Sequence, residues 1–121
     1  MVRTYGLTHL ALAVRDLDRT LRFYREVFGA LPQYRADGCV DVTTPGCHDV
    51  LTFDAGAPMP GETGGIAHFG FRLLSPEDID LAAREVERAG GSVLSRGEFA
   101  PGAPILYAAD PDGYVIEIWF E

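Results

Sequence analysis

The two halves of this chain begin with the same short pattern. The segment 6–14 aligns without a gap with the segment 65–73, and His9 and His68 occupy matching places in the two copies. Apolar residues also repeat at matching places, and each segment runs into a helical pattern. An internal repeat close to half a chain long indicates that one structural unit is built twice, which constrains the fold more than composition does.

Each copy contains one amphipathic helix with clear ends. The first predicted helix begins after Asp16, a capping residue, and ends at Gly29. The second begins at Ser75-Pro76, which supplies a capping serine and a proline at the first helical position, and ends at Gly90-Gly91. Both copies therefore place a helix directly after their opening strand.

Short strand-like segments follow each predicted helix. They are Cys39–Thr43 and Asp49–Phe53 in the first half, and Ser92–Ser95, Ile105–Ala108 and Tyr114–Phe120 in the second. The sequence thus predicts an α+β fold in which each half is a strand, a helix and two or three strands. We expect one domain of two modules, about residues 5–55 and 64–121, joined by the Gly- and Pro-rich segment 55–65.

Charge and composition exclude several classes of protein. The chain has 18 acidic and 10 basic residues, a net charge of −8, and its only cations are arginines. It therefore lacks the basic patch of a nucleic-acid binder and the lysine of a Schiff-base enzyme or a P-loop. No apolar run is long enough to span a membrane, and the N-terminus does not resemble a signal peptide. We expect a cytoplasmic protein that binds neither nucleic acid nor membranes, with Cys39 and Cys47 as free thiols.

Three ionisable residues interrupt strands that are otherwise apolar. His9 shares its strand face with Ala11, and His68 shares its face with Gly70. Small neighbours leave a hollow of the kind that a ligand cavity requires. Glu117 stands inside the apolar run 114–120, where a carboxylate has to be paired, neutralised or bound to a metal.

Two histidines and one carboxylate form a set that binds divalent metals and leaves coordination positions open. The repeat would bring His9 and His68 to equivalent places around a pseudo-twofold axis, with Glu117 nearby. Two structural alternatives stay open, namely that the histidines are hydrogen-bonded core residues and that Glu117 faces water on an edge strand. The sequence favours a metal site.

Residues 6 to 120 resemble the vicinal oxygen chelate superfamily, which includes glyoxalase I, bleomycin and fosfomycin resistance proteins and extradiol dioxygenases. The resemblance rests on the segment 7–17, on Phe23-Tyr24, on the segment 65–68, and on the segment 110–113 leading to Glu117. It implies paired βαβββ modules that form a cupped sheet around a divalent metal, usually in a homodimer. It also implies a small-molecule substrate that chelates the metal through adjacent oxygens.

Extradiol dioxygenases are the branch that the residues resemble most. The resemblance implies that His9, His68 and Glu117 bind Fe(II) or Mn(II), although imidazole and carboxylate also suit Ni(II) and Zn(II). It implies that His48 is the acid–base group and that Tyr107, ten residues before Glu117, donates a hydrogen bond to an oxygen of the reacting complex. This chain would be a one-domain form, shorter than most such enzymes.

Departures from the family patterns keep other readings open. A glyoxalase-like lyase or isomerase is expected to carry a fourth Glu or Gln ligand near Val50, where only His48 and Thr52 share the strand face. Fosfomycin transferases carry Thr where this chain has Ala11, and extradiol enzymes carry a second His where it has Glu98. A non-catalytic drug-binding protein of the bleomycin-resistance type is the remaining alternative.

Two further residues are candidates for substrate contact. Arg72 lies on the face of His68 and either pairs with a substrate carboxylate or forms a salt bridge with an acid at the rim. Trp119 lies on the face of Glu117 and is expected to form a wall of the cavity. The sequence leaves open whether the site closes within one chain or between two chains that exchange modules.

Overall fold

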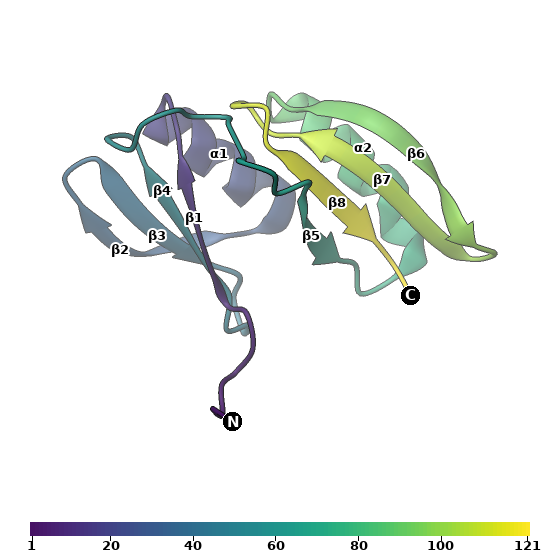
Figure 1. Cartoon of the computed structure of the whole chain (residues 1–121). Helices are drawn as coiled ribbons and strands as arrows, with labels where there is room; N and C mark the ends of the chain where they lie inside the picture. Colours follow the sequence, from purple (N-terminus) through teal and green to yellow (C-terminus); the bar gives the residue numbers. More distant parts are fainter.

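The structure, a computed structural model, describes all 121 residues and consists of two βαβββ modules that follow one another along the chain (Figure 1). Module 1 contains β1 (His9–Ala13), α1 (Leu17–Phe28), β2 (Leu31–Ala36), β3 (Cys39–Thr43) and β4 (Val50–Asp54). Module 2 contains β5 (Phe69–Arg72), a 3₁₀ turn (Pro76–Asp78), α2 (Ile79–Arg88), β6 (Ser92–Ala100), β7 (Ala103–Ala109) and β8 (Val115–Trp119). The predicted α+β fold with a repeated unit is confirmed.

The two sheets have the same topology. Their strand orders are β1-β4-β3-β2 and β5-β8-β7-β6, and in each the first pair is parallel while the others are antiparallel. The register matches as well, because Ala11 pairs with Thr52 in module 1 and Gly70 pairs with Glu117 in module 2. Thr52 is therefore the counterpart of Glu117 in the repeat.

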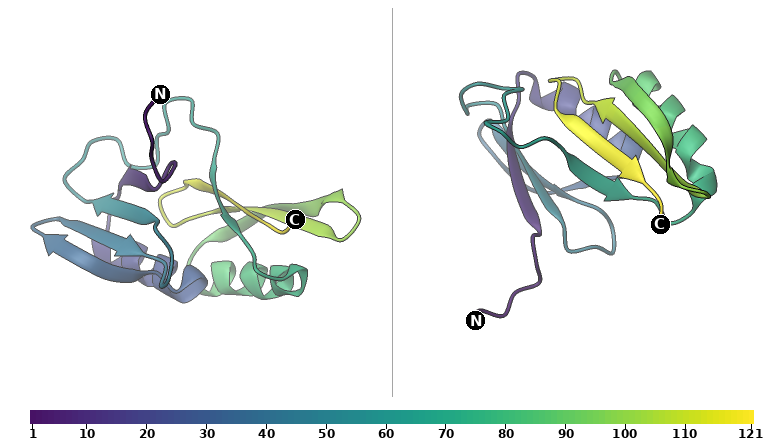
Figure 2. Two further views of the ribbon diagram at one scale, coloured as in Figure 1. Left: turned by 90° about the horizontal axis from the view of Figure 1, so that it is seen from below. Right: turned by 45° about the vertical axis from the view of Figure 1, so that its right-hand side comes forward.

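Both helices lie on the same side of the two sheets (Figure 2). Leu12 and Val14 of module 1 are buried on the helix side, as the strand periodicity predicts, and the core continues into module 2. The opposite face of each sheet, here called the inner face, carries His9 and Ala11 in module 1 and Gly70 and Arg72 in module 2, all exposed. The single chain thus leaves its inner faces open.

Three elements differ most from the sequence-based expectation. β6 runs from Ser92 to Ala100, although the sequence predicted a strand that ends at Ser95. β2 was not predicted, because all six of its residues are exposed and it shows no apolar alternation. The second helix begins with a 3₁₀ turn, and the Ser75 hydroxyl bonds to the Glu77 carboxylate rather than to a backbone amide. Pairing with β3, which a local pattern does not contain, makes β2 a strand.

A buried aspartate joins the two modules. Asp112, in the turn between β7 and β8, accepts hydrogen bonds from Arg15 and Arg19 at 3.1 Å and from the Thr20 hydroxyl at 3.3 Å. Its side chain is fully buried, whereas both arginines are about half exposed. Because these partners lie at and just after the end of β1, the turn of module 2 is held against the start of α1.

A second aspartate of the same turn strengthens the contact. Asp110 accepts a 2.8 Å hydrogen bond from the hydroxyl of Tyr24 in α1, and both side chains are buried. Burial raises the pKa of Asp110, against hydrogen bonds from Tyr24 and two backbone amides that lower it. These contacts fix how the inner faces lie relative to each other.

None of the helices is long and apolar enough to cross a membrane.

Candidate functional site

Three predicted site residues of module 2 meet on its inner face. His68 precedes β5, and its Nε2 lies 3.2 Å from Oε2 of Glu117 in the middle of β8. The hydroxyl of Tyr107, on the neighbouring β7, donates to Oε1 of Glu117 at 3.2 Å. We call His68, Glu117 and Tyr107 trio 2. The half-buried carboxylate that the sequence marked as costly is thus bonded on both oxygens.

The surroundings of trio 2 keep the Tyr107 hydroxyl protonated, so that it can donate a hydrogen bond. Burial, followed by the charge of Glu117, raises the pKa of Tyr107, so its phenol stays protonated at neutral pH. Trp119 lies two residues after Glu117, and its ring covers Gly70, since a Cβ on Gly70 would lie only 2.5 Å from the ring. The space beside the glycine that the sequence marked as leaving a hollow is therefore occupied by the Trp119 ring.

Module 1 carries a matching set of polar residues. Nε2 of His9 lies 2.8 Å from the hydroxyl oxygen of Thr52, and that hydroxyl donates to Oδ1 of Asp41 at 2.6 Å. We call His9, Thr52 and Asp41 trio 1. Asp41 pairs with Thr52 across β3 and β4 as Tyr107 pairs with Glu117 across β7 and β8. The two trios thus stand at the same three positions of the repeat but consist of different side chains.

The two trios do not meet within one chain. No group of three or more His, Cys, Asp or Glu side chains lies close enough to hold a metal ion. His9 bonds to Thr52 in one sheet, while His68 bonds to Glu117 in the other. The expected meeting of both histidines with Glu117 is therefore absent from the single chain, because the modules join through their helix side and the Asp112 turn.

The donor chemistry nevertheless suits a divalent metal. The imidazole of His68 lies 3.2 Å from one oxygen of the Glu117 carboxylate, and Tyr107 donates a hydrogen bond to the other oxygen. His9 presents the equivalent imidazole on the inner face of module 1. These three side chains have the donor chemistry of a ligand set for a divalent metal.

The other predicted residues are divided between the modules. His48 precedes β4 in module 1, is exposed, and stacks on Tyr5 with ring centroids 5.3 Å apart. It lies near the His9 end of the sheet, because Val50 pairs with His9. Arg72 donates to the backbone carbonyl of Glu121 and has no acidic side-chain partner. Cys39 and Cys47 are both free thiols.

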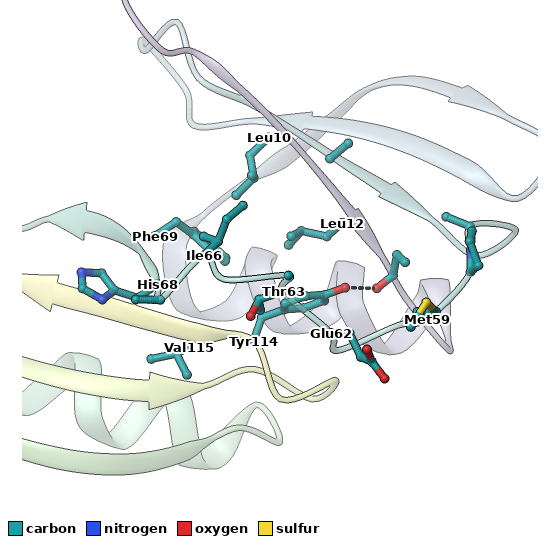
Figure 3. A pocket seen from close by; sticks show the side chains of 16 residues that line it. Leu10, Leu12, Met59, Glu62, Thr63, Ile66, His68, Phe69, Tyr114 and Val115 are labelled. Carbon is teal, nitrogen blue, oxygen red and sulfur yellow. Dashed lines mark hydrogen bonds between the residues drawn. The ribbon is translucent and has the colours of Figure 1, made fainter.

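A cavity of about 460 Å³ lies between β1, the linker and the start of β5 (Figure 3). Most of its lining is apolar, including Leu10, Leu12 and Ile66, and the Tyr114 hydroxyl closes one side by donating to the Ala13 carbonyl at 2.8 Å. In Figure 3 the His68 ring points away from the other labelled side chains. The cavity therefore borders trio 2 without containing it.

The sequence analysis did not identify Asp41, and it considered Thr52 only to show that this strand face carries no Glu or Gln ligand. Both belong to strands that the sequence predicted, and both lie on the same face as His9. Extending the repeat from the histidines to the later strands would have paired Thr52 with Glu117 and Asp41 with Tyr107. The low identity between the two halves hides that correspondence until the strand register is known.

Comparisons with known proteins agree with this architecture. The sequence model of the Glyoxalase/Bleomycin resistance protein/Dioxygenase superfamily matches residues 6–118 of the chain. Glutathione transferase FosA of Serratia marcescens is 28% identical over 93% of this chain and 79% of that protein. The ethylmalonyl-CoA/methylmalonyl-CoA epimerase of Cereibacter sphaeroides is 33% identical over 93% of this chain and 95% of that protein. A solved glyoxalase-related enzyme from Fulvimarina pelagi superposes with a TM-score of 0.79 at 24% identity, covering 98% of this chain and 89% of that one.

Relatives of other reaction classes match the same region. They include the lactoylglutathione lyase GLX1 of Arabidopsis thaliana, the catechol-2,3-dioxygenase of Bacillus subtilis and the manganese-dependent 2,3-dihydroxybiphenyl 1,2-dioxygenase of Geobacillus genomosp. 3. The chain spans only 42%, 41% and 36% of their lengths. Transferases, lyases, epimerases and dioxygenases thus share this unit, and the chain belongs to the glyoxalase/bleomycin resistance protein/dioxygenase superfamily.

Proposed function

We propose that this protein is a metal-dependent, extradiol-type ring-cleaving dioxygenase that acts on a small molecule with adjacent oxygens. The observation that carries the proposal is the convergence of His68 Nε2 and Glu117 Oε2 at 3.2 Å, while the counterpart of Glu117 in module 1 is Thr52. A protein with no second carboxylate at that place offers a set of two histidines and one carboxylate. Such a set leaves the open positions that two substrate oxygens and dioxygen need.

The proposal includes a homodimer in which His9 of a second copy completes the site. The inner faces of a single chain are open, and Leu7 and Ile66 beside the two histidines are 98% and 57% exposed. A twofold assembly that places the inner face of module 1 on module 2 of another copy would cover these apolar residues. It would also create two equivalent sites, each with one His from module 1 and the His–Glu pair of module 2.

The residues around this site have distinct roles in the proposal. Fe(II) or Mn(II), with Ni(II) or Zn(II) as alternatives, would be held by His9, His68 and Glu117 and would supply Lewis acidity toward the substrate oxygens. Tyr107 holds Glu117 in place through its hydrogen bond. His48, on the same module as His9, accepts and returns a substrate proton, and Trp119 limits the space beside Glu117.

Oxygen uptake tests the function. Purified protein is loaded anaerobically with Fe(II) or Mn(II), mixed with a panel of catechols, and followed with an oxygen electrode and by ring-cleavage absorbance. Oxygen consumption with formation of a ring-cleaved product is the expected result. No uptake, combined with isomerisation of thiol–aldehyde adducts by Ni(II)- or Zn(II)-loaded protein, would identify a lyase instead. Failure to bind any metal would leave the drug-binding alternative.

A histidine variant separates catalysis from metal binding. His48→Ala should lower turnover strongly while the bound metal, measured by elemental analysis, stays at the wild-type level, because His48 lies outside both trios. His68→Ala is the matched variant in which metal is lost. Loss of metal in His48→Ala would make His48 a ligand and would contradict the role proposed for it.

A further inference from the structure

The inner faces of the two modules carry almost no positive charge. Arg72 is the arginine that strand register places on an inner face, since it pairs with Trp119 and shares the face of Glu117. Its guanidinium is already bonded to the Glu121 carbonyl. Arg35 of β2 and Arg96 of β6 pair with residues whose side chains are buried on the helix side, and both form ion pairs there or at the outer surface.

Negative charge is present on the same faces. Of the inner-face carboxylates, Glu117 is bonded to His68 and Tyr107, and Asp54 accepts the backbone amides of Gly56 and Ala57. Asp41, like Asp54, has no ion-pair partner, and the hydrogen bond that its carboxylate accepts comes from the neutral hydroxyl of Thr52. Asp41 therefore places a carboxylate on the inner face of module 1 with no arginine paired to it.

Asp41 is also close to the proposed site. It lies two hydrogen bonds from His9, through the Thr52 oxygen, with lengths of 2.6 and 2.8 Å. Its side chain is half-buried in the middle strands of the sheet, where charges interact more strongly than in water. The two positive charges of a divalent metal held by His9, His68 and Glu117 would be balanced by the Glu117 carboxylate and one deprotonated oxygen of the substrate, so the charge of Asp41 would remain toward the rest of a bound substrate.

We propose that Asp41 is a specificity-determining residue that makes this site prefer substrates with a positively charged amine and reject substrates with a carboxylate or phosphate. The inference rests on the proposed function, because it assumes that a catechol binds beside His9. A unit charge several ångströms away, in an environment of intermediate polarity, changes the dissociation constant of a charged ligand by about tenfold or more. It favours cations and disfavours anions, and it leaves neutral ligands unaffected.

Three catechols of similar size but different charge test the inference. Dopamine is cationic, 4-ethylcatechol is neutral and 3,4-dihydroxyphenylacetate is anionic. Their dissociation constants are measured by titration calorimetry with Zn(II)-loaded protein, which does not turn them over, and the quenching of Trp119, the one tryptophan of the chain, gives a second readout. Wild-type protein should bind dopamine about tenfold or more tightly than the anionic catechol, with the neutral one between them.

Asp41→Asn isolates the charge. Asn keeps an oxygen that accepts from Thr52, so the hydrogen bond to Thr52 is preserved while the charge is removed. The spread between the cationic and anionic catechols should collapse to less than about threefold, with the affinity for 4-ethylcatechol unchanged. Asp37→Asn, which removes an exposed acid from the turn between β2 and β3, should keep the wild-type spread.

The outcomes separate this inference from the proposed function. Equal affinities for the three catechols, preference for the anion, or an unchanged spread in Asp41→Asn would overturn the role of Asp41 while leaving a catechol-binding site. Binding of none of the three by metal-loaded protein would overturn the proposed function and this inference with it.

Discussion

The inner faces of the two modules show the same scaffold with different chemistry. In module 2, His68 meets the Glu117 carboxylate, which Tyr107 supports from the next strand. In module 1, His9 meets the Thr52 hydroxyl, which bonds to a carboxylate one strand further away. The strand order and register are the same in both sheets. The histidine and the backbone frame are thus common to both modules, while the carboxylate beside the histidine is present in only one.

This difference determines what the molecule can bind. Two carboxylates beside the two histidines would fill four positions around a cation, as a lyase of the glyoxalase type is expected to do. With Thr52 at one of these places, the proposed site has three protein ligands and leaves more positions open to substrate. The asymmetry between the modules, rather than the repeat itself, therefore favours oxygen chemistry.

Removing the carboxylate of trio 2 should have the largest effect. Glu117→Gln should weaken metal binding by more than about 100-fold, because it removes a charged ligand rather than an outer partner. Thr52→Val, the matched change in trio 1, should alter metal affinity by less than about threefold. Competition titration with a chelating dye measures both. Similar losses in the two variants would show that Thr52 is a ligand and would remove the asymmetry.

Breaking the contact between the modules should have the second-largest effect, a loss of stability. Asp112→Ala should lower the free energy of unfolding by about 2–3 kcal/mol, because it deletes a buried partner of two arginines and Thr20. Asp18→Ala removes an exposed acid paired with Arg35 and should cost less than about 0.5 kcal/mol. Urea unfolding checks both variants. Equal costs would mean that the buried turn does not hold the modules together.

Loss of the Tyr107 hydroxyl should have a moderate effect on metal binding. Tyr107→Phe should weaken metal binding by about tenfold, within the range seen when an outer hydrogen bond to a ligand is removed. The counterpart change in trio 1, Asp41→Asn, should leave metal affinity within about threefold, since Asp41 supports a hydroxyl instead of a ligand. The same dye titration applies. An unchanged affinity in Tyr107→Phe would limit Tyr107 to substrate contact.

The smallest effect concerns the pH dependence of stability. Burial raises the pKa of Asp110 in the folded protein, so the folded state binds a proton more readily than the unfolded state does. Stability from this group is complete below the ordinary carboxyl pKa and falls as the pH rises through the raised value. Asp110→Asn lacks this dependence, so the difference between its stability curve and that of the wild type should change by under about 1 kcal/mol between pH 4 and 7. Urea unfolding across that range measures it, and parallel curves would contradict the assignment.

Local sequence patterns predicted most of the fold. Both helices, the opening strands and the strand with Glu117 have clear periodicity and clear ends at residues such as Asp16 and Gly29. β2 escaped prediction because an exposed strand has no buried face to create a pattern. Its place at the edge of the sheet is set by pairing with β3, which is information that the segment itself does not carry.

The site was only partly predictable for a similar reason. The family resemblance implied that His68, Glu117 and Tyr107 belong to one site, and the structure brings them together. The separation of His9 from this group depends on how the modules pack, through Asp110, Asp112 and their partners in α1. The repeat indicated that the two histidines are equivalent, but equivalent places in two sheets are not the same place in space.

A mixing experiment tests the central claim that two copies share each metal site. His9→Ala and Glu117→Gln are each expected to bind no metal tightly as homodimers. Unfolding and refolding an equal mixture should give heterodimers with one intact site, made of His9 from one chain and His68 with Glu117 from the other. The account predicts recovery of about one quarter of the wild-type tightly bound metal, because half of the dimers are mixed and each has one good site. If the mixture binds no more metal than the two variants alone, the shared site is contradicted.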